Sequence, residues 1–300
     1  MEPLSIVLVA YNPTAHLASC LDSIFIQKFS HYKIIAVDNT PNGEASRLIR
    51  SHYPGVELIE NRKNVGPSMA RNQGIARSDG EFILCLDDDV ILQEHFLSNI
   101  YDKINADMHL GAVQPKILMM DKKTIYSAGI RVSFLRRFCD IGSGRQDNGE
   151  YNNQKAVFGA SSAAVIYRRK ALESIRQEGE YFDSDLFYLF EDVDLSWRLQ
   201  KKGWQIMYYP EASCYHRGGG SRSKNNFSQY LCFRNRYLIL AKNDSFTGFL
   251  RLLAAFVVYD LWRGLSMLFL NTGYFFRACY ELAVYLPKML KKRGYAQSNV

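Results

Sequence analysis

"ILCLDDDVIL", residues 83–92, places three consecutive aspartates between two apolar runs. A short apolar run that ends abruptly in acidic residues predicts a buried strand ending at the edge of a sheet. On extended backbone alternate side chains share a face, so Asp87 and Asp89 should point together while Asp88 points away. Two converging carboxylates suit a hard divalent cation such as Mg²⁺ or Mn²⁺. The alternative is a solvated turn whose charges face water.

The first half of the chain alternates strand and helix patterns. The predicted strands are "LSIVLVA" (4–10), "KIIAVD" (33–38), "VELIE" (56–60) and "EFILCL" (81–86). Helical spacing of apolar residues appears over 17–24, and a second helix is predicted over 66–77. This alternation predicts an α/β fold with a mostly parallel, Rossmann-like sheet covered by helices on both faces.

A polar cluster follows each of these strands. The clusters are Tyr11-Asn12-Pro13, Asp38-Asn39-Thr40, Asn61 through Asn64, and Asp87-Asp88-Asp89. One such cluster is typical of a turn. Four at equivalent strand ends predict a binding site, because ligands of parallel sheets lie at the carboxyl ends of the strands.

Beyond residue 110 the alternation fades. We predict a strand over 111–118, an irregular hairpin region over 124–155, a buried strand over 157–167, a helix over 191–203, a last strand over 204–210 and a basic glycine-rich loop over 216–226. Small residues in the strand over 157–167 would let a ligand approach the backbone.

A second acidic cluster, Glu191, Asp192 and Asp194, opens the helix predicted over 191–203. Acidic residues in a first helical turn stabilise the helix dipole by about 0.3–1 kcal/mol. Three carboxylates within four positions exceed that need, so one is a candidate general base. On a helix Glu191 and Asp194 lie on one side and Asp192 faces elsewhere, and one of the three can pair with Arg198 or a loop.

His216 precedes the basic loop, which carries Arg217, Arg222 and Lys224. An isolated histidine is usually a surface or packing residue, but an imidazole can also complete a cation site begun by two carboxylates. The glycines and cations suit a loop that closes over a diphosphate.

Composition narrows the class of protein. The 300 residues are 47% apolar, which excludes a disordered chain, and the net charge of +7 favours anionic partners. The basic residues form no long arginine-rich arm, so nucleic acid is not an expected partner. Six scattered cysteines predict neither a zinc ribbon nor a disulfide framework and fit a cytoplasmic protein. The opening residues 1–13 predict a first strand and not a signal peptide.

The region 227–300 is rich in leucine and aromatic residues, with interspersed arginines and a terminal cluster of Lys288, Lys291, Lys292 and Arg293. Its longest uncharged stretch, 264–276, is shorter than the roughly 20 residues of a membrane-spanning helix. We therefore predict amphipathic helices lying on an anionic membrane surface. Helices packed on the domain, or on a second copy of the chain, are the alternative.

Taken in order, five motifs resemble the family 2 glycosyltransferases of the GT-A fold over roughly residues 4–220. They are "VAYN" (9–12), "VDN" (37–39), "NVGPSMARNQGI" (64–75), "LDDD" (86–89) and "FEDVDLSWRLQKKGW" (190–204). The stretch from "FGAS" (158–161) to "YHRGGGS" (215–221) is similar to the rhamnosyltransferase-type branch, which builds bacterial surface polysaccharides.

The resemblance implies a GT-A domain over 1–226, with a nucleotide-sugar-binding half (1–110) and an acceptor-binding, catalytic half (111–226). Residues 227–300 would form a helical, membrane-associating region at the inner face of the cell membrane. The implied reaction is metal-dependent, inverting transfer from dTDP-L-rhamnose, or a UDP-sugar, to a glycan or lipid-linked acceptor. The oligomeric state stays open.

The resemblance also implies roles for individual residues. The nucleotide and diphosphate would be bound by Ala10, Tyr11, Asn12, Asp38, Asn64, Gly66, Arg71, Asp87 and Asp88. The cation would be held by Asp87, Asp89 and His216, with Asp89 as the first direct ligand. Asp192 matches the usual catalytic base, with Asp194 in reserve and Glu191 beside them. After Asn39 the chain has Thr-Pro-Asn-Gly in place of the Gly-Ser of relatives, which leaves the ribose contacts unassigned.

Two other classes remain to be weighed. A catalytically silent nucleotide-sugar-binding scaffold would bind donor without turnover, but it has no use for the carboxylates of "FEDVD" (190–194). A nucleotidyltransferase also uses acidic metal sites, but it favours a glycine-rich phosphate loop after the first strand, where this chain has "YNPTAH" (11–16).

Overall fold

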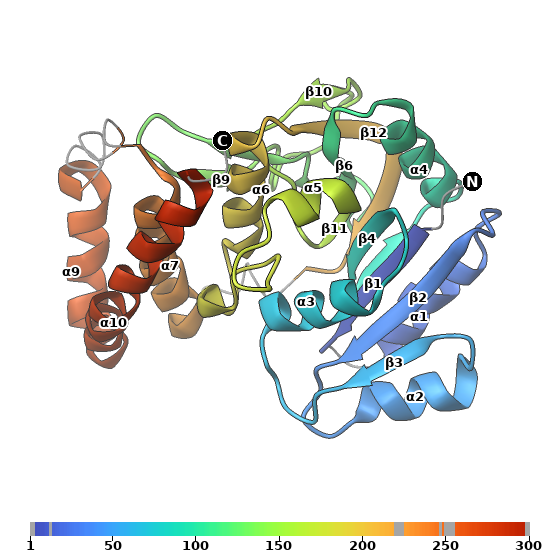
Figure 1. Ribbon diagram of the computed structural model, residues 1–300, viewed down its shortest axis with the longest axis horizontal. Helices are drawn as coiled ribbons and strands as arrows, with labels where there is room; N and C mark the ends of the chain where they lie inside the picture. Colours follow the sequence, from blue (N-terminus) through green and yellow to red (C-terminus); the bar gives the residue numbers. More distant parts are fainter. Residues whose placement is uncertain (1–3, 12–13, 219–224, 246–247, 249–255, 298–300) are drawn as a thin grey trace.

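The computed structural model describes residues 4–11, 14–218, 225–245, 248 and 256–297 (Figure 1). Asn12 and the loop cations Arg222 and Lys224 lie outside the described residues. A mixed ten-stranded sheet forms the centre, with its main strands in the order β10-β12-β6-β11-β4-β1-β2-β3.

The first half of the chain contributes the parallel part of this sheet. Its strands are β1 (Leu4–Ala10), β2 (Tyr32–Asp38), β3 (Glu57–Glu60) and β4 (Phe82–Asp87). β1 lies between β2 and β4, and β3 pairs with β2, all in parallel. The sequence prediction of a mostly parallel sheet is confirmed for this half.

The second half adds longer and mixed strands. They are β5 (Val90–Leu92), β6 (Leu110–Met119), β7 (Ile125–Ser127), β10 (Lys155–Ala156), β11 (Ala164–Arg168) and β12 (Gln205–His216). β11 runs antiparallel to both β4 and β6, whereas β12 runs parallel to β6 and antiparallel to β5. A separate pair joins β8 (Ile130–Val132) to β9 (Phe138–Asp140).

One strand is shorter than predicted. Of the run 157–167, only the part from Ala164 onward belongs to a named strand. The backbone N–H groups of Ala160 and Ser161 donate to the side chains of Ser196 and Gln114 instead of a neighbouring strand. Because side chains satisfy these amides, the segment before β11 is a loop that lies beside the site described below.

Two sets of helices cover the sheet. One face carries α1 (Thr14–Phe25), α2 (Glu44–His52) and α4 (Phe96–Ala106), and the other carries α3 (Pro67–Arg77), α5 (Arg169–Ser174) and α6 (Glu191–Lys201). The period of two in β1 divides its side chains accordingly: Ile6 and Leu8 join the first core, and Val7 joins the second.

The remaining helices gather at one side of the molecule, away from β3 and α2 (Figure 1). They are η1 (Ser184–Leu186), α7 (Asn226–Asn243), η2 (Phe256–Asp260), α9 (Leu261–Leu270) and α10 (Thr272–Gln297). α10 packs along α7, and α7 contacts both α6 and η1. Within the described residues, no helix combines the length and apolar character needed to cross a bilayer. The division at residue 226 stays a prediction, and α7 lies directly against the part before it.

Candidate active site

A cavity of about 440 Å³ opens where β1, β4 and β12 end. Its polar wall consists of Tyr11, Asn39, Asn64, Arg71, Asp87, Asp88, Asp89 and His216. The rest of its lining is largely apolar and includes Tyr126, Ile130, Phe138, Phe187, Tyr188, Leu189, Phe190 and Phe227. Glu191 and Asp192 also line it, so both acidic clusters of the sequence reach the same space.

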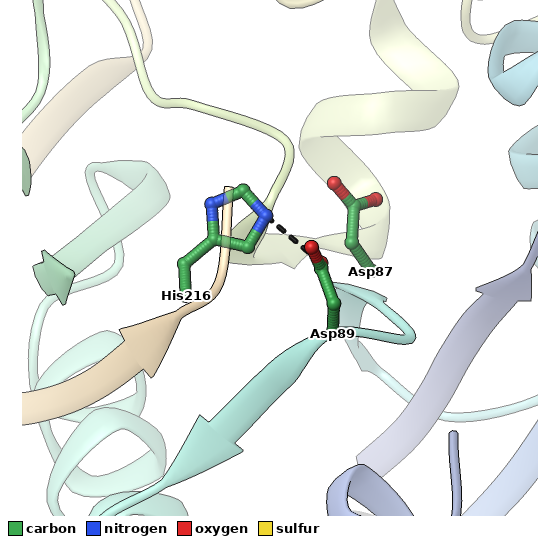
Figure 2. A group of neighbouring side chains, drawn as sticks. All are labelled: Asp87, Asp89 and His216. Atoms are coloured by element: carbon green, nitrogen blue, oxygen red, sulfur yellow. Dashed lines mark ion pairs between the residues drawn. The ribbon is translucent and has the colours of Figure 1, made fainter. Parts of the chain in front are cut away.

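Asp87, Asp89 and His216 form a group that can hold a metal ion (Figure 2). One ligand atom from each residue lies within 4.8 Å of the others. The Nε2 atom of His216 lies 2.9 Å from Oδ1 of Asp89, and the edge of the Tyr126 ring packs against the imidazole. Two carboxylates and an imidazole are a donor set that suits Mn²⁺, and the residues present therefore fit the cation that the sequence predicted.

The two carboxylates of this group differ in their electrostatics. Burial alone would raise the pKa of Asp89, but the hydrogen bond and positive charge of His216 hold it below the ordinary value. Burial raises the pKa of Asp87 in spite of the neighbouring Arg71 guanidinium. The charged form is therefore favoured at Asp89, and its role as the first cation ligand stays a prediction.

Asp88 binds the backbone and is not part of the metal-site group. The expected alternation along a strand does not apply, because β4 ends at Asp87 and the residues Asp88 and Asp89 form the turn before β5. The Oδ2 atom of Asp88 accepts the backbone N–H of Tyr11 at 2.7 Å. This bond fixes the chain just after β1, where Tyr11 lines the cavity. Asp88 therefore shapes the cavity wall through the backbone of Tyr11.

Arg71 on α3 links the two acidic clusters. Its Nη2 lies 2.7 Å from Asp87 and its Nη1 lies 2.9 Å from Glu191, with the side chain only 3% exposed. From the family resemblance, Arg71 was expected to bind the diphosphate. The structure instead commits its terminal nitrogens to two carboxylates and to the carbonyl oxygen of Ser162, while the residue still lines the cavity.

Asp192 lies on the cavity wall at the start of α6. Among the described residues it forms no ion pair; its Oδ1 accepts the backbone N–H of Val193 at 2.8 Å, and its Oδ2 accepts the backbone N–H of Ser162 at 3.4 Å. Burial and the nearby charges of Glu191 and Asp140 raise its pKa to about 8. A buried carboxylate with a raised pKa has the proton affinity that a general base needs near neutral pH.

Asp194 does not line the cavity, which removes the geometric basis for keeping it as a reserve base. It is fully buried, and its carboxylate binds Arg198 at 2.9 Å, Lys242 at 2.9 Å and Asn243 at 2.7 Å. Burial opposes the charged form, but Arg198 and Lys242 hold its pKa below the ordinary value. Asp194 therefore anchors α6 to α7, and the pairing with Arg198 foreseen from the sequence is present.

On the donor side, the structure separates Asp38 from the cavity. Its carboxylate accepts bonds from the backbone and hydroxyl groups of Thr40 and Ser46, which hold the start of α2. The next residue, Asn39, lines the cavity and donates to Asn64 at 3.1 Å. Asn39 stood in the polar cluster that follows β2, but the sequence motif drew attention to the aspartate beside it.

Two further predicted nucleotide contacts have structural roles here. Ala10 is fully buried and belongs to the core on one face of the sheet. Gly66 has a φ of 83°, and a Cβ there would lie 2.6 Å from the Phe187 ring. The glycine thus permits close packing between the turn before α3 and the loop before α6.

Several cavity residues carried no sequence signal. They are Tyr126, Phe138 and Asp140. They come from the hairpin region, where no motif or period marks them. Ser161 and Ser162 also line the cavity, and they belong to the run 157–167 whose small residues were expected to let a ligand approach. Only the three-dimensional pairing of β8 with β9 and of β11 with β4 brings them to the site.

The chain is similar to several known proteins. It is 24% identical over 220 residues to the poly-β-1,6-N-acetyl-D-glucosamine synthase of Staphylococcus aureus (strain COL), covering 72% of this chain and 50% of that protein. The chain thus spans about half the length of the curated relatives it matches.

Solved structures share the fold. The mannosyltransferase PcManGT from Pyrobaculum calidifontis, in complex with GDP-Man and Mn²⁺, superposes with a TM-score of 0.57 at 16% identity, covering 98% of this chain and 85% of that one. S. aureus TarS 1–349 superposes with a TM-score of 0.60 at 15% identity, covering 99% and 87%. Residues 5–176 match the glycosyl transferase family 2. The protein has the GT-A fold and belongs to glycosyl transferase family 2.

Proposed function

We propose that the protein transfers a sugar from a nucleotide-sugar donor to a hydroxyl group of a glycan acceptor in polysaccharide synthesis. The observation that carries the proposal is the single cavity that joins the Asp87–Asp89–His216 group to a buried carboxylate, Asp192, with a raised pKa. The family match and the polysaccharide synthase among the relatives support the same class of reaction.

On the donor side, Asp87, Asp89 and His216 would hold the divalent cation. When bound, that cation neutralises the charge that develops on the departing nucleoside diphosphate. An imidazole in the donor set favours Mn²⁺ over Mg²⁺, which prefers oxygen ligands. Asn39, Asn64 and the backbone of Tyr11 line the space beside this group, where the nucleoside would lie.

On the acceptor side, Asp192 would take the proton from the acceptor hydroxyl as its oxygen attacks the anomeric carbon. The bond from that carbon to the diphosphate breaks in the same step, which inverts the configuration. Glu191 is bound to Arg71 and Asp194 to Lys242, so Asp192 is the acidic residue of this cluster that is positioned for proton transfer.

The donor and acceptor can be proposed more narrowly from the motifs. The rhamnosyltransferase-like stretch favours dTDP-L-rhamnose, with UDP-sugars as the next choice. The apolar acceptor wall, with Phe187, Tyr188 and Phe227, suits the faces of sugar rings or an apolar carrier of the acceptor. A lipid-linked acceptor at a membrane surface is therefore part of the proposal.

A donor panel tests this function. The protein is incubated with dTDP-L-rhamnose, UDP-N-acetylglucosamine or GDP-mannose, each with Mn²⁺, with Mg²⁺ or with EDTA. We expect one donor to release nucleoside diphosphate in a metal-dependent manner, faster with a glycan acceptor present. Metal-dependent binding of a nucleotide without any turnover would contradict the proposal and favour a silent binding scaffold.

Membrane association is proposed on apolar contacts more than on charge. Large exposed side chains on α9 and α10 include Trp262, Phe269, Leu270, Phe276 and Tyr280. By contrast, Lys288 and Lys292 of the basic cluster bind Asp185 and Asp183 within the protein. Two of the four basic residues that were expected to contact an anionic membrane are therefore paired with carboxylates of the protein.

Vesicle sedimentation tests this association. Wild type should sediment with phospholipid vesicles, and the variant Trp262→Asp/Phe269→Asp should stay in the supernatant, because both side chains are exposed and apolar. An apolar contact would be contradicted if salt abolished the sedimentation of wild type and if the variant sedimented as well as wild type without added salt.

A further inference from the structure

The segment just before the acidic cluster of α6 has an unusual backbone. Phe187, Leu189 and Phe190 have φ values of 62°, 68° and 68°, although none is glycine. Non-glycine residues adopt positive φ only where the surroundings hold them there. In the segment 186–190, residues 187–190 line the cavity, and the segment leads directly into Glu191 and Asp192.

The start of α6 is not fixed by its own cap. Its N-cap residue is Phe190, in the left-handed region, and no side-chain hydrogen bond caps the helix within the described residues. A serine, threonine or aspartate at this position would ordinarily fix the entry of the chain into a helix. The position of Glu191 and Asp192 therefore depends on what holds residues 186–190 from outside.

Asn235 on α7 holds this segment. The side chain is fully buried, and its Nδ2 donates to the carbonyl oxygens of Leu186, Tyr188 and Leu189 at 2.9, 2.9 and 2.7 Å. Two amide hydrogens are thus shared among three acceptors of one short segment. The Oδ1 atom accepts from Nε of Arg234 at 2.8 Å, which fixes which end of the amide faces the carbonyls.

Further contacts from the C-terminal helices α7 and α10 support the same segment. Nη2 of Arg234 donates to the carbonyl oxygen of Leu186 at 3.0 Å, while its Nη1 pairs with Glu281 on α10. At the beginning of the same stretch, Lys242 of α7 and Lys292 of α10 bind the buried carboxylate of Asp183 at 2.7 and 2.6 Å. Helices α7 and α10 thus hold the stretch 183–190 at both ends.

We propose that Asn235 is a positioning residue, through which the C-terminal helices hold residues 186–190 in the conformation that directs Glu191 and Asp192 into the cavity. The inference rests on the proposed function for its effect on sugar transfer. Asn235 lies beyond the part of the chain that matches the family, 5–176, so this role belongs to the C-terminal helices. Those helices then serve the acceptor side of the reaction in addition to any contact with a membrane.

The test compares Asn235→Asp and Asn235→Ala with wild type. Aspartate keeps the size of the side chain but replaces the donor with oxygens that repel the three carbonyls, whereas alanine only removes the donor. Asn105→Asp is the matched control, because Asn105 is exposed on α4. Arg234→Lys is a second variant, which keeps a charge opposite Glu281 but loses the paired geometry of the guanidinium.

Three quantities are measured for each variant. Amide hydrogen exchange over residues 184–192 should rise in Asn235→Ala, rise further in Asn235→Asp and stay unchanged in the control. The kcat of sugar transfer should fall about 100-fold in the Asn235 variants and stay unchanged in the control, since a fall of about 100-fold is the scale expected when a reacting group is displaced by about 1 Å. Mn²⁺-dependent binding of the nucleotide should change less than about twofold, because Asp87, Asp89 and His216 lie on other elements.

The opposite results overturn the proposal. Faster exchange over 184–192 with unchanged kcat would show that the segment does not position the reacting groups. Faster exchange throughout the sheet, with equal losses of nucleotide binding and of kcat, would show a general structural role. If Asn235→Asp fails to fold, the alanine and Arg234→Lys variants decide between the same outcomes.

A failure of the proposed function would look different. If wild type transfers no sugar from any donor, the function fails. The exchange measurement needs no substrate: a selective rise over 184–192 then supports the hold of α7 on this segment, and unchanged exchange overturns it.

Discussion

The acidic clusters at the end of β4 and at the start of α6 have similar compositions and opposite surroundings. Each supplies three carboxylates within three or four positions, and in each one carboxylate is bound by other groups of the protein. Asp88 accepts the N–H of Tyr11, whereas Asp194 binds Arg198, Lys242 and Asn243. Asp88 still lines the cavity, whereas Asp194 does not.

The carboxylates that face the cavity differ in the charges around them. Asp89 has the imidazole of His216 beside it, and this partner holds its pKa low against the effect of burial. Asp192 has burial and the negative charges of Glu191 and Asp140 acting together, and its pKa rises to about 8. The same residue type therefore favours the charged form in one cluster and the protonated form in the other, because of its neighbours.

The largest expected effect comes from removing the proton acceptor. Asp192→Asn should lower the kcat of sugar transfer by about 10²–10⁴-fold, the usual contribution of a general base. Nucleotide binding with Mn²⁺, measured by calorimetry, should change far less than kcat, since Asp192 is not one of the three residues of the metal-site group. Full transfer activity in this variant would remove the distinction between the two clusters.

Removing a cation ligand should affect binding first. Asp89→Ala should weaken Mn²⁺-dependent nucleotide binding at least about 100-fold, the upper end of the losses seen for groups that only support metal ligands. The control is Asp102→Ala, whose carboxylate is exposed on α4. Calorimetric titration with Mn²⁺ and dTDP or UDP measures the loss, and equal affinity in both variants would exclude Asp89 as a ligand.

The third prediction compares the free energy of unfolding of two variants in the cluster at the start of α6. Asp194→Asn leaves Lys242 and Arg198 buried beside a neutral group, so unfolding free energy should fall by about 3–5 kcal/mol. Asp192→Asn should leave stability unchanged or raise it at neutral pH, because the native state disfavours the charge on Asp192. Urea denaturation at pH 7 compares them, and a larger loss for Asp192→Asn would reverse the assignment of roles.

The same contrast has a pH dependence. The folded-state pKa of Asp194 is lowered, so its contribution to stability is fully present above the ordinary aspartate pKa and is lost as the pH falls through the folded value. Acid should therefore loosen the contact between α6 and α7. The free energies of unfolding of wild type and Asp194→Asn, measured by denaturation, should converge as the pH is lowered from 7 to 3.

The smallest predicted effect is a shift of the pH profile. Transfer by wild type should increase with pH along a limb whose midpoint lies above 3.8 and no higher than about 8, as Asp192 loses its proton. A bound cation lowers this midpoint from the upper value by adding positive charge nearby. Glu191→Gln removes a negative neighbour of Asp192, so the limb should move to lower pH.

Glu178→Gln, an exposed change outside the cavity, should leave the profile in place. A limb that moves to higher pH in Glu191→Gln would contradict the account of why Asp192 has a raised pKa.

The sequence was sufficient where a local period decides the geometry. The strand pattern placed the three aspartates at the end of β4, although Asp88 and Asp89 lie in a turn and not on the extended backbone that was expected. His216 was a candidate from its chemistry alone, and the structure brings it to the two carboxylates. The metal-site group was therefore predicted from the sequence.

The sequence was insufficient where a distant partner decides. Asp192 and Asp194 carry the same chemistry two positions apart, and Asp194 binds, besides Arg198, the distant residues Lys242 and Asn243, the first of them 48 residues further along. Asp38 and Asn39 are adjacent, and the hydroxyl of Ser46 determines which of them faces the cavity. Asn235 has no motif, because its role depends on carbonyl oxygens nearly 50 residues earlier.

Arg71 links the two acidic clusters electrostatically. One guanidinium holds Asp87 with one nitrogen and Glu191 with another, in a place almost without solvent to screen it. Neutralising Asp87 would remove one of the negative charges that oppose the charge of Arg71, and so would make the electrostatic potential at Asp192 more positive. Under the proposed roles, cation binding at Asp87 and proton affinity at Asp192 are therefore linked, and the affinity for the cation varies with pH.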